Sequence, residues 1–393
     1  MTLTIKQEEG LRVAVARYKA HEAYTCIAGY AGTGKSTLIS FIISALGVDP
    51  ALDVCYVAFT GKAATVLQSK GCPNATTAHK LLYQARPMPN GTYKFIPKTS
   101  LGDYKVVVVD EVSMLPLKMW ELLLSHHVYV IAAGDPAQIP PIDKDADNHV
   151  LDNPHVFLDE IMRQAQDSEI IRLSMWVREG RPLNSFPCRN EQVRFLSPSE
   201  LNTGVYTWPD QIICATNAKR NYINDLIRQG KGFGPEPCVG DKVISLRNHW
   251  EFFSQTGTWA LTNGSIGMIE DYDVEEIYIP KYISEKPIPY MHTIIQLEDE
   301  DRFYDVPIDY QCLKTGNPAL DKKQSFLLNK NKATPEAPYE FAYAYAITGH
   351  KAQGSQWDKV LVFVEGWPFE AEERRRWLYT SITRASEKLV MVR

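Results

Sequence analysis

The feature of this sequence that most restricts its fold is the segment from residue 29 to residue 36, Gly-Tyr-Ala-Gly-Thr-Gly-Lys-Ser. Its spacing, G-x-x-x-x-G-K-S, is that of a phosphate-binding loop, whose backbone N–H groups surround an anion. A β-prone run, residues 24–28, precedes the loop, and apolar residues recur at helical spacing from 38 to 46 after it. Such a loop binds phosphate at the N-terminus of a helix, so the sequence predicts an α/β fold that handles a nucleoside triphosphate.

Two residues of this loop have predicted roles in phosphate and metal binding. Lys35 is expected to reach the β- and γ-phosphate oxygens, and Ser36 to offer its hydroxyl to Mg²⁺. The cofactors that the loop predicts are therefore a nucleoside triphosphate, which the resemblance described below implies is ATP, and Mg²⁺.

The second half of a nucleotide site is predicted at residues 106–111. Four valines, residues 106–109, have the composition of a buried parallel strand, and Asp110 and Glu111 follow at its carboxyl end. Adjacent acids at a strand end can also be a solvated turn. After a phosphate loop, however, we expect Asp110 to hold the metal and Glu111 to polarise the attacking water, which implies hydrolysis rather than transfer to a small acceptor.

Length and composition set the class of protein. The chain has 393 residues, of which 45% are hydrophobic, enough for two to three domains with cores of their own. No apolar run approaches the ~20 residues that span a bilayer, so we expect a soluble protein of the cytoplasm without a membrane partner. Seven cysteines without a C-x-x-C pair argue against zinc and against disulfides. The net charge of −5 gives no general attraction to a polyanion, so a nucleic-acid partner needs a local basic groove.

The pattern along the chain predicts two α/β layers with two insertions. The first layer takes residues 1–83 and 103–150, with strands at 54–59, 106–109 and 128–133. Residues 84–102, with Asn-Gly at 90–91, predict a β-hairpin inserted in it.

The second layer is expected at residues 151–236 and 337–393, including a strand at 343–347. Short strands separated by turns predict an all-β insertion at 237–336, within which the Lys-rich stretch 314–332 is expected to be a solvated loop. The three arginines at 374–376 follow two glutamates, which favours a salt-bridged helix face over a DNA clamp.

Three further motifs complete an ordered set. Residues 134–141 read Gly-Asp-Pro-Ala-Gln-Ile-Pro-Pro and place Gln138 at the same sheet edge as the carboxylates, where its amide can sense a γ-phosphate. Residues 348–356 read Thr-Gly-His-Lys-Ala-Gln-Gly-Ser-Gln, and residues 378–385 read Leu-Tyr-Thr-Ser-Ile-Thr-Arg-Ala. With the phosphate loop and the two acids, these motifs resemble superfamily 1 DNA helicases of the RecD-like branch, from about residue 3 to the C-terminus.

This resemblance implies two RecA-like P-loop NTPase motor domains. It also implies an SH3-like fold for the all-β insertion, although the insertion matches the family only in its position and in its pattern of short strands. It implies that Gln7 reads adenine, and that Arg163 and Arg384 act as arginine fingers in cis, although either arginine could be a surface ion pair. The predicted nucleotide-binding residues are Gln7, Gly29, Gly32, Thr33, Gly34, Lys35, Ser36, Thr37 and Gly354.

The DNA contacts implied by the resemblance are spread over loops of both layers. In the first layer, one contacting segment begins after Phe59, a residue that stands where relatives often carry proline. The second segment includes His79, which could equally be a packed helix residue. Gln356 stands where many relatives have an acidic or hydroxyl residue. The predicted DNA-binding residues outside the hairpin are Thr60, Lys62, Thr77, His79, Thr348, His350, Lys351 and Gln356.

The hairpin offers two aromatic residues, Tyr93 and Phe95, for stacking on a terminal base pair, so it is either a strand-separating pin or a plain structural hairpin. The function predicted is that of a monomeric, DNA-stimulated ATPase that moves on single-stranded DNA, with 5′ to 3′ polarity implied by the resemblance. Forked duplex DNA and replication or recombination proteins are the expected partners. An ATP-gated DNA-binding switch or accessory subunit and a metabolic kinase remain the alternatives.

Overall fold

The computed structural model of the chain describes residues 3–87, 93–140, 147–162, 166–257, 260–297, 301–330, 337–366 and 370–393. The chain forms two compact units. Unit 1 contains Met1–Tyr83, Pro97–Ala215 and Thr348–Arg393, and unit 2 contains Gln84–Ile96 and Thr216–Ile347. No helix within these described ranges is both long enough and apolar enough to cross a bilayer.

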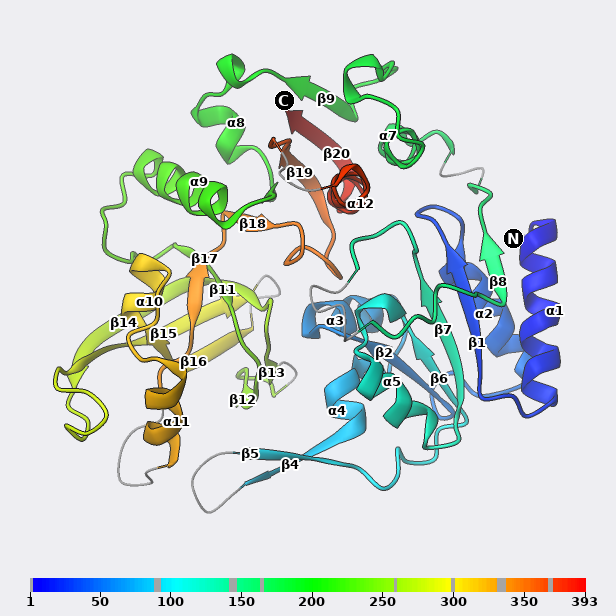
Figure 1. Ribbon diagram of the computed structural model, residues 1–393, viewed down its shortest axis with the longest axis horizontal. Coiled ribbons are helices and arrows are strands. Elements are labelled where there is room, and N and C mark those ends of the chain that lie inside the picture. The colour runs from blue at the N-terminus through cyan, green and yellow to red at the C-terminus, as the bar shows by residue number, and fades with distance from the viewer. Residues whose placement is uncertain are drawn as a thin grey trace. The chain divides into compact units, whose positions relative to one another are not determined.

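Unit 1 holds both predicted α/β layers (Figure 1). The first layer is a parallel sheet in the order β3-β2-β6-β7-β1-β8, which confirms the predicted strands. Apolar residues of α1 and α2 cover one face of it, and those of α4 and α5 cover the other. The strands are β1 (Tyr24–Gly29), β2 (Val54–Ala58), β3 (Thr76–Thr77), β6 (Val106–Val109), β7 (Tyr129–Gly134) and β8 (Val156–Leu158). The helices are α1 (Ile5–Lys19), α2 (Lys35–Leu46), α3 (Gly61–Ser69), α4 (Ala78–Leu82), η1 (Val112–Met114) and α5 (Leu117–Leu124).

The second layer is also parallel, with strands β10, β19, β20 and β9 in that order. Helices α7 and α12 pack against each other and against β20. The strands are β9 (Val193–Leu196), β10 (Gln211–Cys214), β19 (Trp357–Phe363) and β20 (Ala385–Val392). The helices are α7 (Glu169–Arg178), η3 (Leu183–Ser185), η4 (Pro198–Glu200), α8 (Thr203–Thr207) and α12 (Ala371–Ile382). Two parallel α/β layers, as predicted, therefore lie in one compact unit.

Unit 2 contains the two insertions. The predicted hairpin is confirmed as the strand pair β4 and β5, and the large insertion is an antiparallel sheet in the order β16-β15-β14-β11-β17 with a separate β12-β13 pair. The strands are β4 (Tyr83–Pro87), β5 (Tyr93–Pro97), β11 (Lys242–Ser245), β12 (His249–Phe253), β13 (Ala260–Leu261), β14 (Ile266–Ile277), β15 (Ile288–Leu297), β16 (Arg302–Asp309) and β17 (Phe341–Tyr343). The helices are α9 (Asn217–Gly230), α10 (Tyr310–Thr315) and α11 (Lys322–Lys330), and β18 (Ala346–Thr348) follows at the return to unit 1.

The prediction of a solvated loop at 314–332 is wrong. Asp309 caps α10 by accepting a hydrogen bond from the Cys312 N–H at 2.8 Å, and Leu328 of α11 is fully buried in a small core with Leu320 and Ile283. The apolar positions are few, and the lysines between them hide the helical spacing. The predicted strand at 343–347 is also divided, because β17 ends at Tyr343 and pairs with β11.

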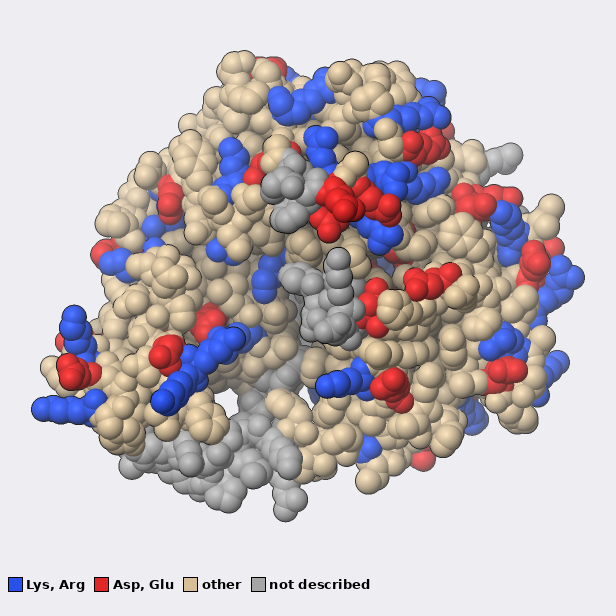
Figure 2. Space-filling view, viewed as in Figure 1, with Lys and Arg blue, Asp and Glu red and all other residues tan. Residues whose placement is uncertain are grey.

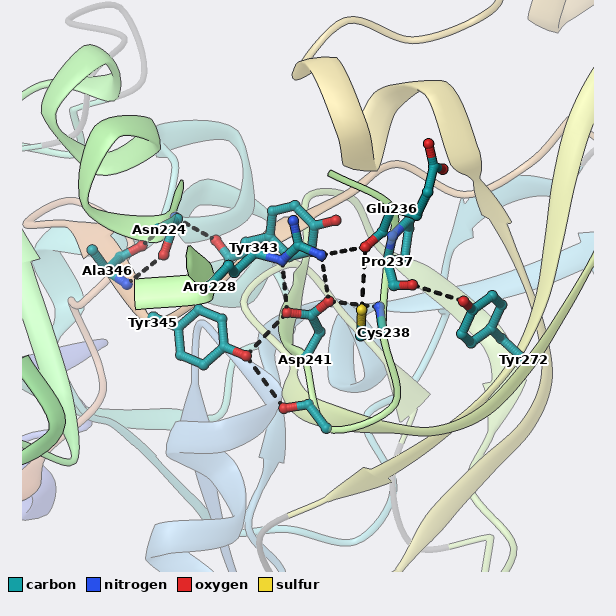
Figure 3. A network of polar contacts seen from close by, with 11 residues as sticks. Asn224, Arg228, Glu236, Pro237, Cys238, Asp241, Tyr272, Tyr343, Tyr345 and Ala346 are labelled. Carbon is teal, nitrogen blue, oxygen red and sulfur yellow. Dashed lines mark hydrogen bonds and ion pairs between the residues drawn. The ribbon is translucent and has the colours of Figure 1, made fainter. Parts of the chain in front are cut away.

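A buried polar network fixes the root of the large insertion (Figure 3). The Arg228 guanidinium of α9 donates to both carboxylate oxygens of Asp241, at 2.9 and 3.0 Å, and to the Glu236 carbonyl. Asp241 also accepts from the Cys238 N–H at 2.8 Å and from the Tyr345 hydroxyl at 3.0 Å. The segment by which the chain leaves α9 is thereby tied to the segment by which it returns.

Charged side chains show no separation by sign on the face drawn in Figure 2, where acidic and basic groups are interspersed. This distribution agrees with the small net charge of −5.

Candidate functional site

The backbone of the phosphate loop has the shape that its glycines predict. Gly32 and Gly34 have φ angles of +77° and +79°, in the left-handed region, and Gly34 is the N-cap of α2. A Cβ atom on Gly34 would lie 2.5 Å from the Nε2 atom of Gln7, so a larger residue would collide with α1. The loop lies at the N-terminus of a twelve-residue helix, where N–H groups and the helix dipole favour an anion.

The Lys35 ammonium lies against its own loop. Its Nζ atom donates to the carbonyl oxygens of Gly29 at 2.6 Å and of Tyr30 at 3.1 Å. Phosphate oxygens carry charge and accept stronger hydrogen bonds than neutral carbonyls do, so a triphosphate can draw Lys35 away from them. Ser36 and Thr37 lie in the first turn of α2, with Ser36 exposed.

Gln7 is buried, with 1% exposure, and contacts the phosphate loop. Its Oε1 atom accepts from the Thr4 N–H at 3.0 Å in a capping box, and its Nε2 atom donates to the Thr33 carbonyl at 3.3 Å and contacts the Met162 sulfur at 3.3 Å. Thr33 in turn donates its hydroxyl to the Tyr30 carbonyl at 2.8 Å. The structure thus brings Gln7 to the nucleotide loop, and its reading of adenine stays a prediction.

The two predicted carboxylates follow β6. Burial and the nearby charge of Glu111 raise the pKa of Asp110, and Lys35 and Lys70 oppose that rise. Glu111 has a φ of +51°, which is rare for a residue with a side chain, and its N–H donates to the Asp110 carboxylate at 3.0 Å. A carboxylate that resists ionisation gains from a divalent cation, so Asp110 fits the predicted magnesium ligand together with the Ser36 hydroxyl.

Arg384 lies two residues after the end of α12, and its side chain is 7% exposed. Its guanidinium donates to the carbonyls of Thr380 at 3.0 Å and Ser355 at 3.2 Å, and its Nη1 atom is 3.6 Å from Glu111 Oε1. The structure therefore brings the predicted finger to the predicted water-activating residue. Arg163 lies outside the described residues.

One cavity of about 180 Å³ joins the motifs of both layers. Gly354, with a φ of +73°, brings its backbone close to the first layer, because a Cβ there would lie 3.2 Å from the Thr60 hydroxyl and 3.5 Å from Glu111 Oε2. Six predicted site residues line the cavity, namely Thr60, Asp110, Glu111, Gly354, Gln356 and Arg384.

Two of the predicted DNA contacts in the first layer serve as helix caps. Thr60 accepts a hydrogen bond from the Ala63 N–H at 3.2 Å, and Thr77 accepts one from the Lys80 N–H at 3.3 Å. The side chain of Lys62 lies outside the described residues.

The imidazole of His79 packs between aromatic rings. Its ring centre lies 6.1 Å from that of Phe59 and 6.0 Å from that of Tyr83, and burial lowers its pKa. This packing fits the alternative that His79 is a packed helix residue, so the DNA role of His79 stays a prediction.

The second-layer loop starts where β18 ends, at Thr348. Its carbonyl accepts a hydrogen bond from the Ala352 N–H at 3.1 Å, and burial lowers the pKa of His350. Lys351 is half-buried and Gln356 is exposed.

The hairpin is described in part. Phe95 is 40% exposed, whereas the Tyr93 side chain and the turn at 88–92 lie outside the described residues. An exposed aromatic on a hairpin is compatible with either alternative for this element.

Gln138, the predicted γ-phosphate sensor, is half-buried in the turn after β7. Three other side chains at the interlayer contact had no predicted role. The first belongs to Asp135, which is almost fully buried. Tyr379 lies inside the motif at 378–385 without an assigned part. The guanidinium of Arg178, which belongs to no motif, lies 3.6 Å from the centre of the Tyr30 ring. The spacing of Arg178 in α7 gives no signal that it contacts the phosphate loop.

Two family models and several helicases are similar to this chain. A family model for an AAA domain matches residues 4–196, and one for a UvrD-like helicase C-terminal domain matches residues 343–392. The ATP-dependent DNA helicase dda of Enterobacteria phage T4 is 23% identical over 437 residues, 97% of this chain and 97% of that protein. The ATP-dependent RecD2 DNA helicase of Deinococcus radiodurans is 25% identical over 381 residues, 92% of this chain and 46% of that protein.

Solved structures match the fold along the whole chain. Bacteroides Pif1 bound to ssDNA has a TM-score of 0.53 at 17% identity, covering 100% of this chain and 92% of that one. Pif1 helicase from Candida albicans has a TM-score of 0.51 at 18% identity, covering 100% and 94%. The predicted resemblance to superfamily 1 helicases of the RecD-like branch is confirmed, and so is the fold of two RecA-like layers; the SH3-like class of the insertion stays a prediction.

Proposed function

We propose that this chain is an ATP-dependent DNA helicase that moves along single-stranded DNA, with 5′ to 3′ polarity, and displaces the complementary strand. The observation that carries the proposal is the cavity in which Glu111 of the first layer meets Arg384 and Gly354 of the second. The similarity to the phage T4 DNA helicase over 97% of both chains supports the choice of DNA as the track.

In the hydrolysis step, the phosphate loop and Lys35 hold the triphosphate. Ser36 and Asp110 would hold Mg²⁺, which when bound neutralises charge on the phosphate oxygens. Glu111 accepts a proton from the attacking water. The proposal is supported by the position of Glu111, which follows β6 and lines the same cavity as Arg384.

The coupling step is assigned to groups that respond to the γ-phosphate. Arg384, and Arg163 by its motif, would stabilise the charge that develops on the phosphoryl group, and Gln138 would report its presence. The 60–62 and 348–351 segments would then grip DNA alternately as the two layers close and open. This assignment explains why two layers with separate motifs are needed for one hydrolysis site.

The natural partners in this proposal are single-stranded DNA and forked duplex DNA, and the enzyme works as a monomer. We infer a cytoplasmic setting in a bacterial or phage-infected cell, with replication or recombination proteins as recruiting partners. The likeness to a phage helicase is the support for this setting.

The test uses the purified chain with Mg²⁺ and ATP. ATP hydrolysis is measured with and without single-stranded DNA, and strand displacement is measured on duplexes that carry one 5′ or one 3′ tail. Stimulated hydrolysis and displacement from the 5′ tail are expected. Displacement from the 3′ tail alone would overturn the polarity, and hydrolysis that ignores DNA would favour an ATP-gated binding switch instead.

A further inference from the structure

Tyr379 of α12 joins three parts of the site through one hydroxyl group. The side chain is buried, with 1% exposure of the residue. Its hydroxyl donates to the Asp135 carboxylate at 2.5 Å and accepts from the N–H of Ala31, in the phosphate loop, at 2.8 Å. One second-layer side chain thus contacts the phosphate loop and the loop after β7 at the same time.

The chemistry of this contact leaves little freedom. A phenol has one O–H to donate, and here a buried carboxylate takes it, so the oxygen is oriented to accept from Ala31. The second Asp135 oxygen accepts from the Ala137 N–H at 2.9 Å. Burial raises the pKa of both Tyr379 and Asp135, as is expected for acidic groups that water does not reach.

The next residue of the helix holds the same loop again. The Thr380 hydroxyl accepts from the Ile139 N–H at 2.9 Å, and the Gln353 amide donates to the Ile139 carbonyl at 2.8 Å. Gln138, the predicted γ-phosphate sensor, lies between Asp135 and Ile139 in the chain. Its loop is therefore held on both sides by side chains of the second layer.

The backbone of the phosphate loop connects Lys35 to the Tyr379 contact. Tyr30, whose carbonyl accepts from Lys35, precedes Ala31, so a triphosphate that draws Lys35 away changes the peptide next to the Tyr379 contact. The Arg178 guanidinium of α7 covers the Tyr30 ring at 3.6 Å. The second layer therefore contacts two adjacent residues of the loop, Tyr30 and Ala31, and the Tyr30 carbonyl is one of the two that Lys35 binds.

We propose that Tyr379 is a positioning residue that couples the phosphate loop and the Gln138 loop to α12, the helix that ends at Ile382, two residues before Arg384. Loading of the phosphate loop is transmitted through the Ala31 N–H and the Tyr379 hydroxyl to the second layer, which also carries the predicted DNA-binding loop at 348–351. This inference rests on the proposed function, because it concerns the link between ATP and DNA at that site.

The test measures coupling rather than activity alone. The dissociation constant for single-stranded DNA is measured on the full chain with and without a non-hydrolysable ATP analogue, for the wild type, Tyr379→Phe and Tyr129→Phe. Tyr129 is the matched control, because its buried hydroxyl bonds Thr25 at 2.6 Å and the Ala14 carbonyl at 2.9 Å within the first layer only. Thermal unfolding is followed for all three proteins.

Tyr379→Phe should bring the ratio of the two DNA dissociation constants close to one, from the roughly 5- to 150-fold range of coupled sites. Tyr129→Phe should keep the wild-type ratio although it destabilises the fold to a similar extent. An unchanged ratio in Tyr379→Phe, or an equal loss in Tyr129→Phe, would overturn the inference. A wild type without any DNA-stimulated hydrolysis would contradict the proposed function instead.

A second variant protects the test if Tyr379→Phe folds poorly. Asp135→Asn keeps an acceptor oxygen for Tyr379 but removes the charge, so it should reduce the ratio partially. The Tyr379→Phe/Asp135→Asn double variant should then lose no more coupling than Tyr379→Phe, because both changes act on one hydrogen bond. Additive losses would show that the two residues act separately and would contradict the proposal.

Discussion

Two buried arginines of this protein meet carboxylates in different ways. At the root of the large insertion, Arg228 binds both oxygens of Asp241 at 2.9 and 3.0 Å, and the two side chains are 5% and 0% exposed. At the contact of the two α/β layers, Arg384 is 3.6 Å from Glu111, whose side chain is 25% exposed. The first pair has the geometry of a bidentate hydrogen-bonded ion pair, and the second does not.

The difference separates a structural contact from an exchangeable one. Both carboxylate oxygens of Asp241 accept hydrogen bonds from the protein (Figure 3). Loss of Arg228 would therefore leave the Asp241 charge buried without a cation. The Glu111 side chain is partly exposed, and the guanidinium of Arg384 is too far away for a hydrogen bond. The 3.6 Å pair has no hydrogen bond to break, so it is the contact of the two that can exchange its partner for a phosphate oxygen or a water molecule.

The largest effect should come from Arg384→Ala. If Arg384 leaves Glu111 to stabilise the γ-phosphate in the transition state, its removal should lower the rate of ATP turnover by about 10³ to 10⁵, the range of an arginine finger. Nucleotide binding should change little, because the phosphate loop and Lys35 remain. Single-turnover hydrolysis and binding of a fluorescent ADP analogue separate these two quantities.

Arg384→Lys is the matched control for charge without the planar guanidinium. It should recover only a small part of the rate, because the carbonyls of Thr380 and Ser355 orient a guanidinium by its separate N–H groups. Full activity in either Arg384 variant would show that this arginine is a structural ion pair like Arg228.

Glu111→Gln should lower the hydrolysis rate by about 10² to 10⁴, the usual contribution of a general base. The amide keeps the size of the side chain but cannot take a proton from water. ATP binding and thermal stability should stay close to the wild type, which equilibrium binding and a thermal scan will show. Normal turnover would remove Glu111 from the mechanism and leave its left-handed backbone without a functional reason.

Arg228→Met should act on stability alone. Removal of one partner of a buried pair costs about 3 to 5 kcal/mol, because the carboxylate of Asp241 stays buried without its cation. Amide hydrogen exchange should rise in β11, which follows Asp241, while exchange in β6 stays slow. The Arg228→Met/Asp241→Leu double variant should recover much of the loss; if it were less stable than Arg228→Met, desolvation of Asp241 would not be the cause.

The parts of this comparison differ in how far the sequence could predict them. The phosphate loop and the Asp110-Glu111 pair are each a short contiguous segment, and each follows a mostly buried strand. Local pattern is enough for such sites. The family resemblance also implied that Arg384 would come to the nucleotide site, and in the structure Arg384 lies 3.6 Å from Glu111.

Contacts between distant side chains could not be predicted in this way. The hydrogen bond from Ala31 to Tyr379 joins residues 348 positions apart, and nothing in the spacing of either motif specifies it. Arg228 and Asp241 are only 13 positions apart, but their partner Tyr345 returns after the whole insertion. The short helices α10 and α11 were missed because each buries only a few apolar residues among lysines.

The smallest effect is expected at a third charged contact, on the ribbon formed by β14, β15 and β16. His292 lies between Asp305 at 2.7 Å and Glu275 at 3.1 Å, and all three side chains are partly exposed. Partial burial lowers the pKa of His292, but the hydrogen bonds to Asp305 and Glu275 outweigh it, so that the pKa is raised above 6.5. Like Arg228, His292 bonds carboxylate oxygens through two of its nitrogen atoms, but its two partners are different residues and are exposed to water.

The sign of the pH dependence follows from that direction. Because the folded pKa of His292 is higher than the unfolded one, its contribution is complete below about pH 6.5 and is lost as the pH rises through the folded value. Solvent screening of exposed pairs keeps this contribution under ~1 kcal/mol. An NMR titration of the His292 ring should give a pKa above the ordinary value, and Asp305→Asn should lower it. An ordinary pKa in the wild type would mean that the ribbon carboxylates are too well hydrated to hold the cation, and that burial is what gives the Arg228 pair its strength.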